Sequence, residues 1–145
     1  MEPASPARLY ATVTGALLLV LGIVGFFYDA SFAGPSDLEG ALGFLEVNAW
    51  LNLLYVLTGA IGLLAAGVAS RPYSLATAVL YTLLGIFGLG TGWFHLLVGL
   101  LGFAAVAGTP GTKARRRLRG SKRARSVREE ARRSEPRANA ARERA

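Results

Sequence analysis

Uncharged, strongly apolar stretches alternate with short polar connections along the first 112 residues. Three such stretches span residues 9–28, 47–70 and 72–112. A bilayer core of about 30 Å is crossed by roughly 20 helical residues, so each of the first two stretches predicts one membrane-spanning helix. The third is long enough for two helices. Gly88, Gly90 and Gly92 predict a reversal within it, because glycine weakens a helix and accepts the positive φ angles of a tight turn.

We therefore predict an all-α fold, an antiparallel four-helix membrane bundle with helices near residues 8–29, 47–69, 73–89 and 92–108. The last two helices reach only about 25 Å at 1.5 Å per residue, so a re-entrant hairpin that turns back inside the membrane stays an alternative. Residues 1–112 form the predicted transmembrane domain, and residues 113–145 form a basic tail. Beyond Ser126 the tail has a single aliphatic residue larger than alanine, Val127, so we predict that it is disordered.

Small residues recur at steps of four and three positions in all four predicted helices. Spacing of about 3.5 residues keeps one stripe facing a partner under a left-handed supercoil, and lipid gives helices no hydrophobic reason to associate. We therefore predict left-handed seams along the bundle axis, although glycine is common in membrane helices and some matches are expected by chance. The predicted packing glycines are Gly15, Gly22, Gly25, Gly59, Gly62, Gly85, Gly88, Gly92, Gly99 and Gly102.

The second and fourth predicted helices also resemble each other. Tyr55 and His95 each begin the pattern x-x-x-Gly-x-x-Gly, 40 positions apart in the same chain direction. Such a repeat is consistent with a duplication, and parallel repeats are one way in which transporters are built. Inert bundles also contain repeats, so the pattern alone does not indicate transport.

Charge is concentrated at one end of the chain and predicts the orientation. The tail from Lys113 holds 14 of the 16 Lys and Arg residues, and the body holds only Arg8 and Arg71. In a four-span chain these basic residues fall on one side, while the connection over residues 29–46 carries four acidic residues and no basic one. Cytoplasmic loops are enriched in Lys and Arg, so both termini are predicted to be cytoplasmic. A re-entrant hairpin gives the same orientation. Cleavage of residues 1–33 as a signal peptide is disfavoured, because the apolar run is long and no basic segment precedes it.

The composition excludes several kinds of chemistry. The chain has no Cys and one His, which excludes disulfide chemistry, and a zinc site or a two-His haem within one chain. Ser31 and Ser36 lie in the outer connection, and Ser70 and Ser74 lie at the opposite end from His95. No nucleophile is therefore indicated. We expect no catalytic activity, no cofactor and no metal.

Polar residues near the outer ends of the second and fourth predicted helices form the candidate site. In the four-span model Asn52 and Gly92, and likewise Tyr55 and His95, lie at similar depth, and a carboxylate from the outer connection could orient the imidazole. One hypothesis is an outward-facing pocket for a small ligand, a proton or an ion. The alternative, which we favour, is a set of interhelical hydrogen bonds that fix the bundle. The candidate residues are Asn48, Asn52, Tyr55, His95, Asp29 and Glu46.

The basic tail begins directly after the last predicted helix. Juxtamembrane Lys and Arg are attracted to anionic lipids by about 1 kcal/mol each, so anionic head groups of the inner leaflet are the expected partner. The sequence does not favour a nucleic-acid partner, since the tail has no aromatic residue to stack on bases. Formation of homo-oligomers through glycine faces that are not used within the bundle stays an alternative. The predicted lipid-surface residues are Lys113, Arg115, Arg116, Arg117, Arg119, Lys122, Arg123 and Arg125.

The segment VNAWLNLLYVLTGAIGL, followed by ASRPY, resembles the second span of small prokaryotic four-span membrane proteins known as the domain of unknown function 4383 type. That span resembles N-x-x-H-N-x-x-H-x-x-x-G-x-x-G-L, and a further His begins the last span. Asn48, Asn52, Gly59, Gly62 and His95 match this pattern, whereas Leu51 and Tyr55 stand where those proteins usually have histidines. The resemblance covers about residues 8–108 and implies a prokaryotic plasma membrane, with no established activity.

These observations lead to two functional hypotheses. The first is a non-catalytic integral membrane protein, structural or regulatory, with its polybasic tail on the inner leaflet. The second is a small transport or ligand-binding membrane module that uses Asn52, Tyr55 and His95.

Overall fold

The computed structural model describes residues 4–32, 34, 40–42, 45–88, 92–111 and 120–130. Four α-helices make up its body: α1 (Pro6–Gly25), α2 (Ala49–Ala65), α3 (Ser70–Ile86) and α4 (Gly92–Ala107). Two three-residue strands, β1 (Gly40–Leu42) and β2 (Leu45–Val47), lie between α1 and α2. The order of the helices follows the predicted one, and their bounds differ from the prediction by at most four residues.

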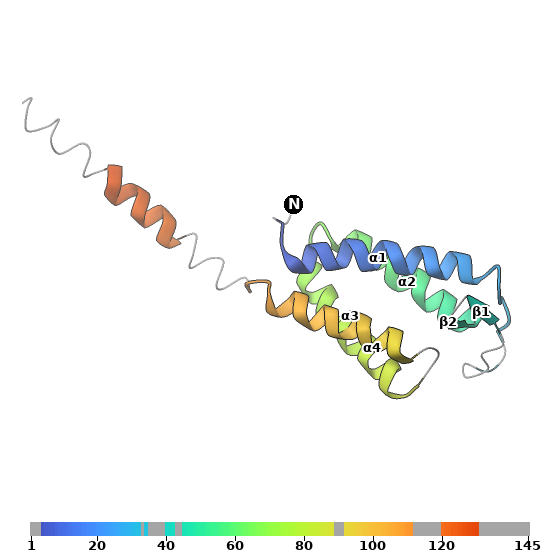
Figure 1. The fold of residues 1–145 in the computed structure, drawn as a ribbon. Helices are drawn as coiled ribbons and strands as arrows, with labels where there is room; N and C mark the ends of the chain where they lie inside the picture. Colours follow the sequence, from blue (N-terminus) through green and yellow to red (C-terminus); the bar gives the residue numbers. More distant parts are fainter. Residues whose placement is uncertain are drawn as a thin grey trace, which may run out of the picture. The chain divides into compact units, whose positions relative to one another are not determined.

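Figure 1 shows the helices as two antiparallel pairs, α1 with α2 and α3 with α4. Each pair is a helical hairpin, and contacts within a hairpin are far more extensive than contacts between the hairpins. We call α1–α2 the first hairpin and α3–α4 the second hairpin.

Local sequence explains where the helices begin. At the start of α1 the Ser5 side chain accepts a hydrogen bond from the Arg8 N–H, and Pro6 occupies the first helical position. Asn48 caps α2 in the same way by accepting from the Leu51 N–H at 2.9 Å. Such side-chain caps satisfy backbone donors that have no partner within the helix. The α3 N-cap, Ala69, provides no side-chain bond.

A β-hairpin in the connection between α1 and α2 was not predicted from the sequence. It is antiparallel, with Leu42 opposite Leu45 and Gly40 opposite Val47. Leu45 and Val47 are buried, and they pack in the cluster of Tyr55, Tyr81 and Phe94. The expected all-α class therefore holds for the bundle, while β2 adds two apolar residues that cover one end of the core.

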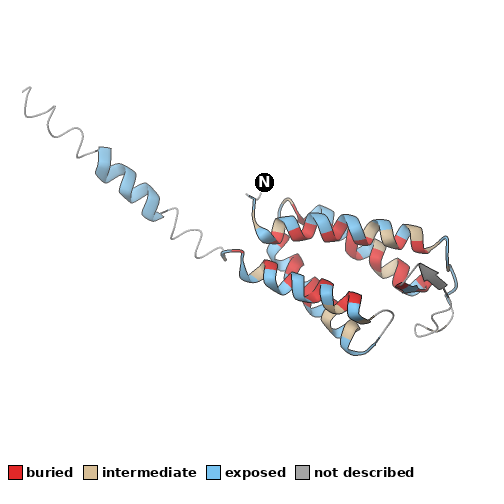
Figure 2. Ribbon diagram, viewed as in Figure 1, coloured by how far each residue is buried: buried red, intermediate tan, exposed pale blue. Residues whose placement is uncertain are grey.

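Many large hydrophobic side chains lie on the outside of the bundle. Figure 2 shows buried positions on the helix sides that face one another and exposed positions on the outside. The fully buried side chains include Tyr55, Tyr81, His95, Asn52 and Ser74, whereas Leu64, Val68 and Ile86 are 65–78% exposed. Small residues, polar residues and aromatic rings therefore line the interior, and many large aliphatic residues lie on the surface.

By length and composition α1 is suited to crossing a membrane, whereas α2 and α4 are apolar but have only 17 and 16 residues. Residues 110–145 are a separate unit. Within the tail, where disorder was predicted, residues 120–130 form a helix with every residue exposed. The remainder of the predicted disordered segment lies outside the described residues.

Candidate functional site

A hydrogen bond between Tyr55 and His95 lies at the centre of the candidate site. The Tyr55 hydroxyl is 2.6 Å from His95 Nε2, although the two residues are 40 positions apart and belong to different hairpins. Both side chains are almost fully buried, at 1% and 0% exposure. The structure thus joins the two residues that the sequence placed at similar depth.

Aromatic rings surround the imidazole of His95. The ring centroids of Tyr55, Tyr81 and Phe94 lie 5.8, 5.6 and 5.9 Å from its own. Tyr55 and Tyr81 are stacked at 6.2 Å. The imidazole therefore lies beside the Tyr55–Tyr81 stack, at a similar distance from each of the two rings.

Tyr81 contributes a buried polar group that sequence analysis did not select as a site residue. Its hydroxyl lies beside Thr58 but makes no hydrogen bond of good geometry with any residue that the structure describes. The side chain is 0% exposed. A buried donor without a well-formed hydrogen bond is costly.

Asn52 and Asp29 join the end of α1 to the start of α2. Asn52 Nδ2 donates to the Asp29 carbonyl at 2.9 Å, and its amide lies directly against Gly25. One Asp29 carboxylate oxygen accepts from the Ser31 N–H at 2.7 Å. These bonds hold the outer end of the first hairpin together and explain why glycine occupies position 25.

The other candidate residues have structural roles or lie apart from the pair. Asn48 is the buried N-cap of α2, which satisfies its side-chain oxygen within the helix end. Glu46 is exposed on β2. The Nε2 atom of His95 is hydrogen-bonded to the Tyr55 hydroxyl. The expected orientation of the His95 imidazole by Asp29 or Glu46 stays a prediction.

The predicted glycine seams lie mainly inside each hairpin instead of along one axis shared by all four helices. A Cβ on Gly15 or Gly59 would meet the backbone of the facing helix, as would one on Gly22, Gly85, Gly92 or Gly99. Two glycines instead face a tyrosine hydroxyl of the other hairpin, Gly62 that of Tyr73 and Gly102 that of Tyr10. At Gly22, Gly59, Gly62, Gly85, Gly99 and Gly102 an added methyl group would come closer than 3.0 Å to a neighbouring atom, and at Gly15 and Gly92 the fit would be tight.

Gly88 departs from the predicted packing role. A Cβ on this residue would meet nothing within 4 Å, and its φ of +68° lies in the left-handed region. Gly88 is therefore required for the reversal after α3, as the glycine-rich segment predicted, and not for helix packing.

Tyrosine hydroxyls also bridge the hairpins about one helical turn from the Tyr55–His95 pair, since their acceptors Val98 and Thr58 lie three residues after His95 and Tyr55. Tyr10 on α1 donates to the Val98 carbonyl at 2.9 Å, and Tyr73 on α3 donates to the Thr58 carbonyl at 3.1 Å. Sequence reasoning included neither tyrosine among its site residues. Tyr10 and Tyr73 directly precede Ala11 and Ser74, the first residues of two small-residue stripes, and this position was the signal that could have identified them.

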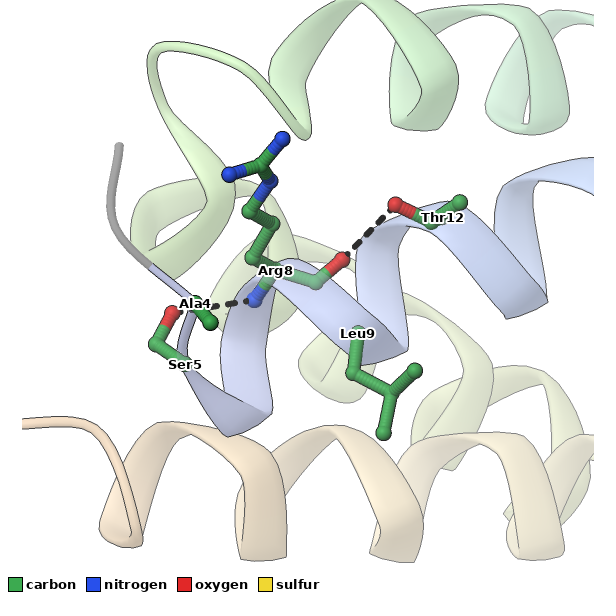
Figure 3. Close-up of a pocket in the computed structure, with 5 residues that line it drawn as sticks. All are labelled: Ala4, Ser5, Arg8, Leu9 and Thr12. Atoms are coloured by element: carbon green, nitrogen blue, oxygen red, sulfur yellow. Dashed lines mark hydrogen bonds between the residues drawn. The ribbon is translucent and has the colours of Figure 1, made fainter. Parts of the chain in front are cut away.

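A shallow pocket lies on the first turns of α1, away from these contacts. It has a volume of about 240 Å³ and is lined by Ala4, Ser5, Arg8, Leu9 and Thr12. Figure 3 shows that Ser5 and Thr12 are hydrogen-bonded to the backbone of Arg8. These hydroxyls therefore serve the local helix, and the pocket does not coincide with the predicted site.

Part of the predicted lipid surface can be placed. Lys122, Arg123 and Arg125 are exposed on the helix over residues 120–130. The five other predicted residues, Lys113, Arg115, Arg116, Arg117 and Arg119, lie outside the described residues. Within the described parts of the chain, no three His, Cys, Asp or Glu residues are grouped so that they could hold a metal ion.

Comparison with known families gives one match. A family model described as Domain of unknown function (DUF4383) matches residues 8–92, which cover α1 from its third residue, α2, α3 and the first residue of α4. No curated protein and no solved structure matches the chain.

Proposed function

The chain belongs to the DUF4383 family, and from this premise we propose that it is a non-catalytic integral membrane protein with a structural or regulatory role. Its four helices would cross the membrane as a bundle, with both termini in the cytoplasm of a prokaryotic cell. One observation carries this proposal: small residues, polar residues and aromatic rings line the interior, and large aliphatic side chains cover much of the exterior.

The exposed surface has the chemistry of a lipid-facing one. The exposed large hydrophobic residues of α1 include Leu9, Val13, Leu17, Val20 and Ile23, which recur around the outer side of the helix. Monomeric soluble proteins rarely expose contiguous apolar patches larger than a few hundred Å². A lipid environment removes this cost and also favours interior hydrogen bonds, because hydrocarbon offers polar groups no partner.

Positive charge at one end of the bundle supports the proposed orientation. Arg71 Nε donates to the carbonyl of Thr109 at 3.2 Å, and the Ala7 N–H donates to the hydroxyl of the same residue at 2.9 Å. Arg8 and Arg71 thus both lie at the end where α4 finishes, whereas Asp29 lies at the opposite end of α1. The positive-inside rule then puts the arginine end in the cytoplasm.

The basic tail fits a role at the inner leaflet. Lys122, Arg123 and Arg125 are all exposed, so their charges are available to anionic head groups. Any homo-oligomer would need contacts other than the seam glycines. Each described glycine within the four helices faces another helix of the same chain.

Membrane insertion and orientation are tested together by fusing a reporter after Ala145 and extracting membranes with carbonate. We expect the protein to stay in the membrane fraction. A fused reporter that works only in the cytoplasm should show activity. Recovery of the chain in the soluble fraction, or activity of a periplasm-specific reporter, would contradict the proposal.

A second candidate function, a small transport or binding module, is favoured by the buried Tyr55–His95 pair. Ionisable groups inside membrane helices are candidates for function. Replacing His95 by Ala separates the two candidates in the purified protein. A binding role predicts an altered ligand or proton response with folding retained, whereas a structural role predicts a change in stability alone.

A further inference from the structure

Exposed aromatic side chains gather at one end of the bundle. Figure 1 shows the end of α1, the start of α2, the end of α3 and the start of α4 together at this end. Among the residues that the structure describes, seven aromatic ones are exposed, and six of them lie at or just beyond these helix ends. The seventh, Phe103, lies within α4. We call the six residues the aromatic rim: Phe27, Tyr28, Phe32, Trp50, Phe87 and Trp93.

The rings of the rim are held by the fold although they are exposed. Phe32 and Trp50 pack edge to face with their ring centroids 5.2 Å apart. Trp93 packs in the same way on the buried Phe94, at 6.2 Å. Trp50 and Trp93 keep 45% and 53% of their surface exposed. A ring that is partly held by protein, with a polar N–H at one edge, suits the interface between lipid and water.

The opposite end of the bundle carries the two arginines of the body. Arg71 donates to the Thr109 carbonyl at 3.2 Å, and the hydroxyl of the same threonine accepts from the Ala7 N–H at 2.9 Å. Arg71, Arg8 and the end of α4 therefore lie at one level. Apart from these arginines the four helices contain no Asp, Glu, Lys or Arg. The uncharged belt of the bundle is thus bounded by the arginines at one end and by the aromatic rim at the other.

The second hairpin gives the height of this belt. Arg71 and Phe87 are 16 positions apart along α3 and its C-cap, and Trp93 and Thr109 are also 16 positions apart. At 1.5 Å per residue both separations correspond to about 24 Å. The hydrocarbon core of a typical bilayer is about 30 Å thick. The belt of the second hairpin is therefore shorter than a typical bilayer core.

The contact between Tyr55 and His95 relates the depths of the two hairpins. The two side chains meet at 2.6 Å, and α2 and α4 both begin at the rim. Trp50 lies five positions before Tyr55, whereas Trp93 lies two positions before His95. Trp93 is therefore about 4–5 Å nearer the middle of the bundle than Trp50. An interfacial layer of the bilayer is roughly 5–8 Å deep, so one layer can hold both tryptophans. This agreement favours four full spans over a re-entrant second hairpin.

We propose that the bundle is matched to a thin bilayer, with a hydrocarbon core of about 24 Å. The aromatic rim lies in the outer interfacial layer, and Arg8 and Arg71 lie at the inner one. The partner that fits this surface is a bilayer of short-chain phospholipid. The lengths of α2, α3 and α4, which are 17, 17 and 16 residues, are the lengths that such a bilayer requires. This inference rests on the proposed membrane insertion and specifies the lipid.

A series of lipids with different chain lengths tests the match. The full chain is reconstituted in vesicles that mix a brominated phosphatidylcholine with dimyristoleoyl-, dipalmitoleoyl-, dioleoyl- or dieicosenoyl-phosphatidylcholine, whose chains lengthen in that order. Bromine quenches tryptophan fluorescence, so the two tryptophans of the chain report which lipid surrounds it. We expect the two shorter lipids to be preferred, with the shortest bound roughly fivefold better than the longest. Equal binding of all four, or a preference for dioleoyl or longer chains, overturns the proposal.

The depth of each tryptophan is a second test. Trp50→Phe and Trp93→Phe each leave one tryptophan and keep an aromatic ring at the changed position. Spin labels near the head group or near the end of the acyl chain then quench the remaining tryptophan. We expect stronger quenching by the shallow label in both variants, with Trp93 slightly deeper than Trp50. Stronger quenching of Trp93 by the deep label overturns the proposal, because the second hairpin would then end inside the hydrocarbon core.

Leu101→Trp, in a chain that also carries Trp50→Phe and Trp93→Phe, is the matched control. Leu101 is 53% exposed, as Trp93 is, and it lies about 12 Å further along α4. The deep label should quench the new tryptophan more strongly than the shallow one. The same depth at positions 93 and 101 would overturn the proposal. A chain that does not bind the vesicles refutes the proposed membrane insertion instead, so the two failures are distinguishable.

Discussion

The hydroxyl of Thr109 accepts a hydrogen bond of 2.9 Å from the backbone N–H of Ala7 and donates one of 2.8 Å to the Ala105 carbonyl. The bond to Ala7 joins the end of α4 to the first turn of α1, 102 positions apart. At the corresponding place in the other half, the end of α2 continues by a short covalent connection into α3. The side chain of Thr109 thus joins α4 to α1 by a hydrogen bond, at the place where a covalent connection joins α2 to α3.

Thr109→Val should destabilise the bundle by about 1–3 kcal/mol, because the buried N–H of Ala7 loses its acceptor. Thr109→Ser keeps the hydroxyl and should cost well under half as much. Unfolding by SDS in mixed micelles, followed by circular dichroism, measures both. Equal losses in the two variants would show that the methyl group, and not the hydrogen bond, is what matters.

Gly59→Ala should be strongly destabilising, by roughly 2 kcal/mol or more, because the new methyl would lie 2.6 Å from the Gly15 carbonyl and the facing backbone cannot yield cheaply. Gly67→Ala is the matched control, since nothing lies within 4 Å of its added Cβ. The same unfolding assay applies. A tolerated alanine at position 59 would mean that α1 and α2 do not pack through this glycine.

Gly88→Ala should cost about 1 kcal/mol or more through backbone strain alone, since alanine must adopt a φ near +68°. Gly88→Asn should cost less, because asparagine tolerates the left-handed region better than other residues with a Cβ. Thermal unfolding of the original protein and the two variants in the same detergent ranks their stabilities. An alanine variant as stable as the original would place the reversal elsewhere.

Asn48→Ala should destabilise α2 by about 1 kcal/mol, because the Leu51 N–H loses its cap. Asn48→Asp should retain most of the stability, since a carboxylate also caps a helix. If Asn48 were instead a ligand-binding residue alone, the alanine variant would unfold like the original protein in the assay.

Replacing Lys122, Arg123 and Arg125 by Gln should weaken contact of the tail with anionic lipid about fivefold per charge at low salt, from about 1 kcal/mol each near the surface. A fluorophore on the tail of the full chain, compared in nanodiscs with and without phosphatidylserine, measures this. Raising the salt concentration should reduce the difference. An effect of the same size without the anionic lipid would indicate a partner other than the membrane surface.

Much of the architecture could be read from residue patterns, because it depends on local chemistry. The lengths of the apolar stretches indicated the four helices, and the glycine-rich segment around Gly88 indicated the reversal between α3 and α4. The β-hairpin escaped prediction. Its burial depends on Leu45 and Val47 meeting the distant rings of Tyr55 and Phe94, a contact that no local pattern encodes.

The candidate site was predictable in part for the same reason. Equal spacing in the second and fourth helices placed Tyr55 and His95 at one depth, and their 2.6 Å contact agrees with this. The sequence did not reveal Tyr10 and Tyr73, whose hydroxyls bond backbone carbonyls. Every residue has a carbonyl, so the acceptor leaves no signature in the sequence.

The sequence by itself determined the helices, the approximate reversal points and the concentration of positive charge in the tail, because periodicity, glycine and charge act over a few neighbouring residues. Only the tertiary structure decided which glycine faces which backbone, and that the seams lie within hairpins while tyrosines join them. The reason is geometric: a small residue permits close approach on any side, and the partner is selected by how the whole bundle packs.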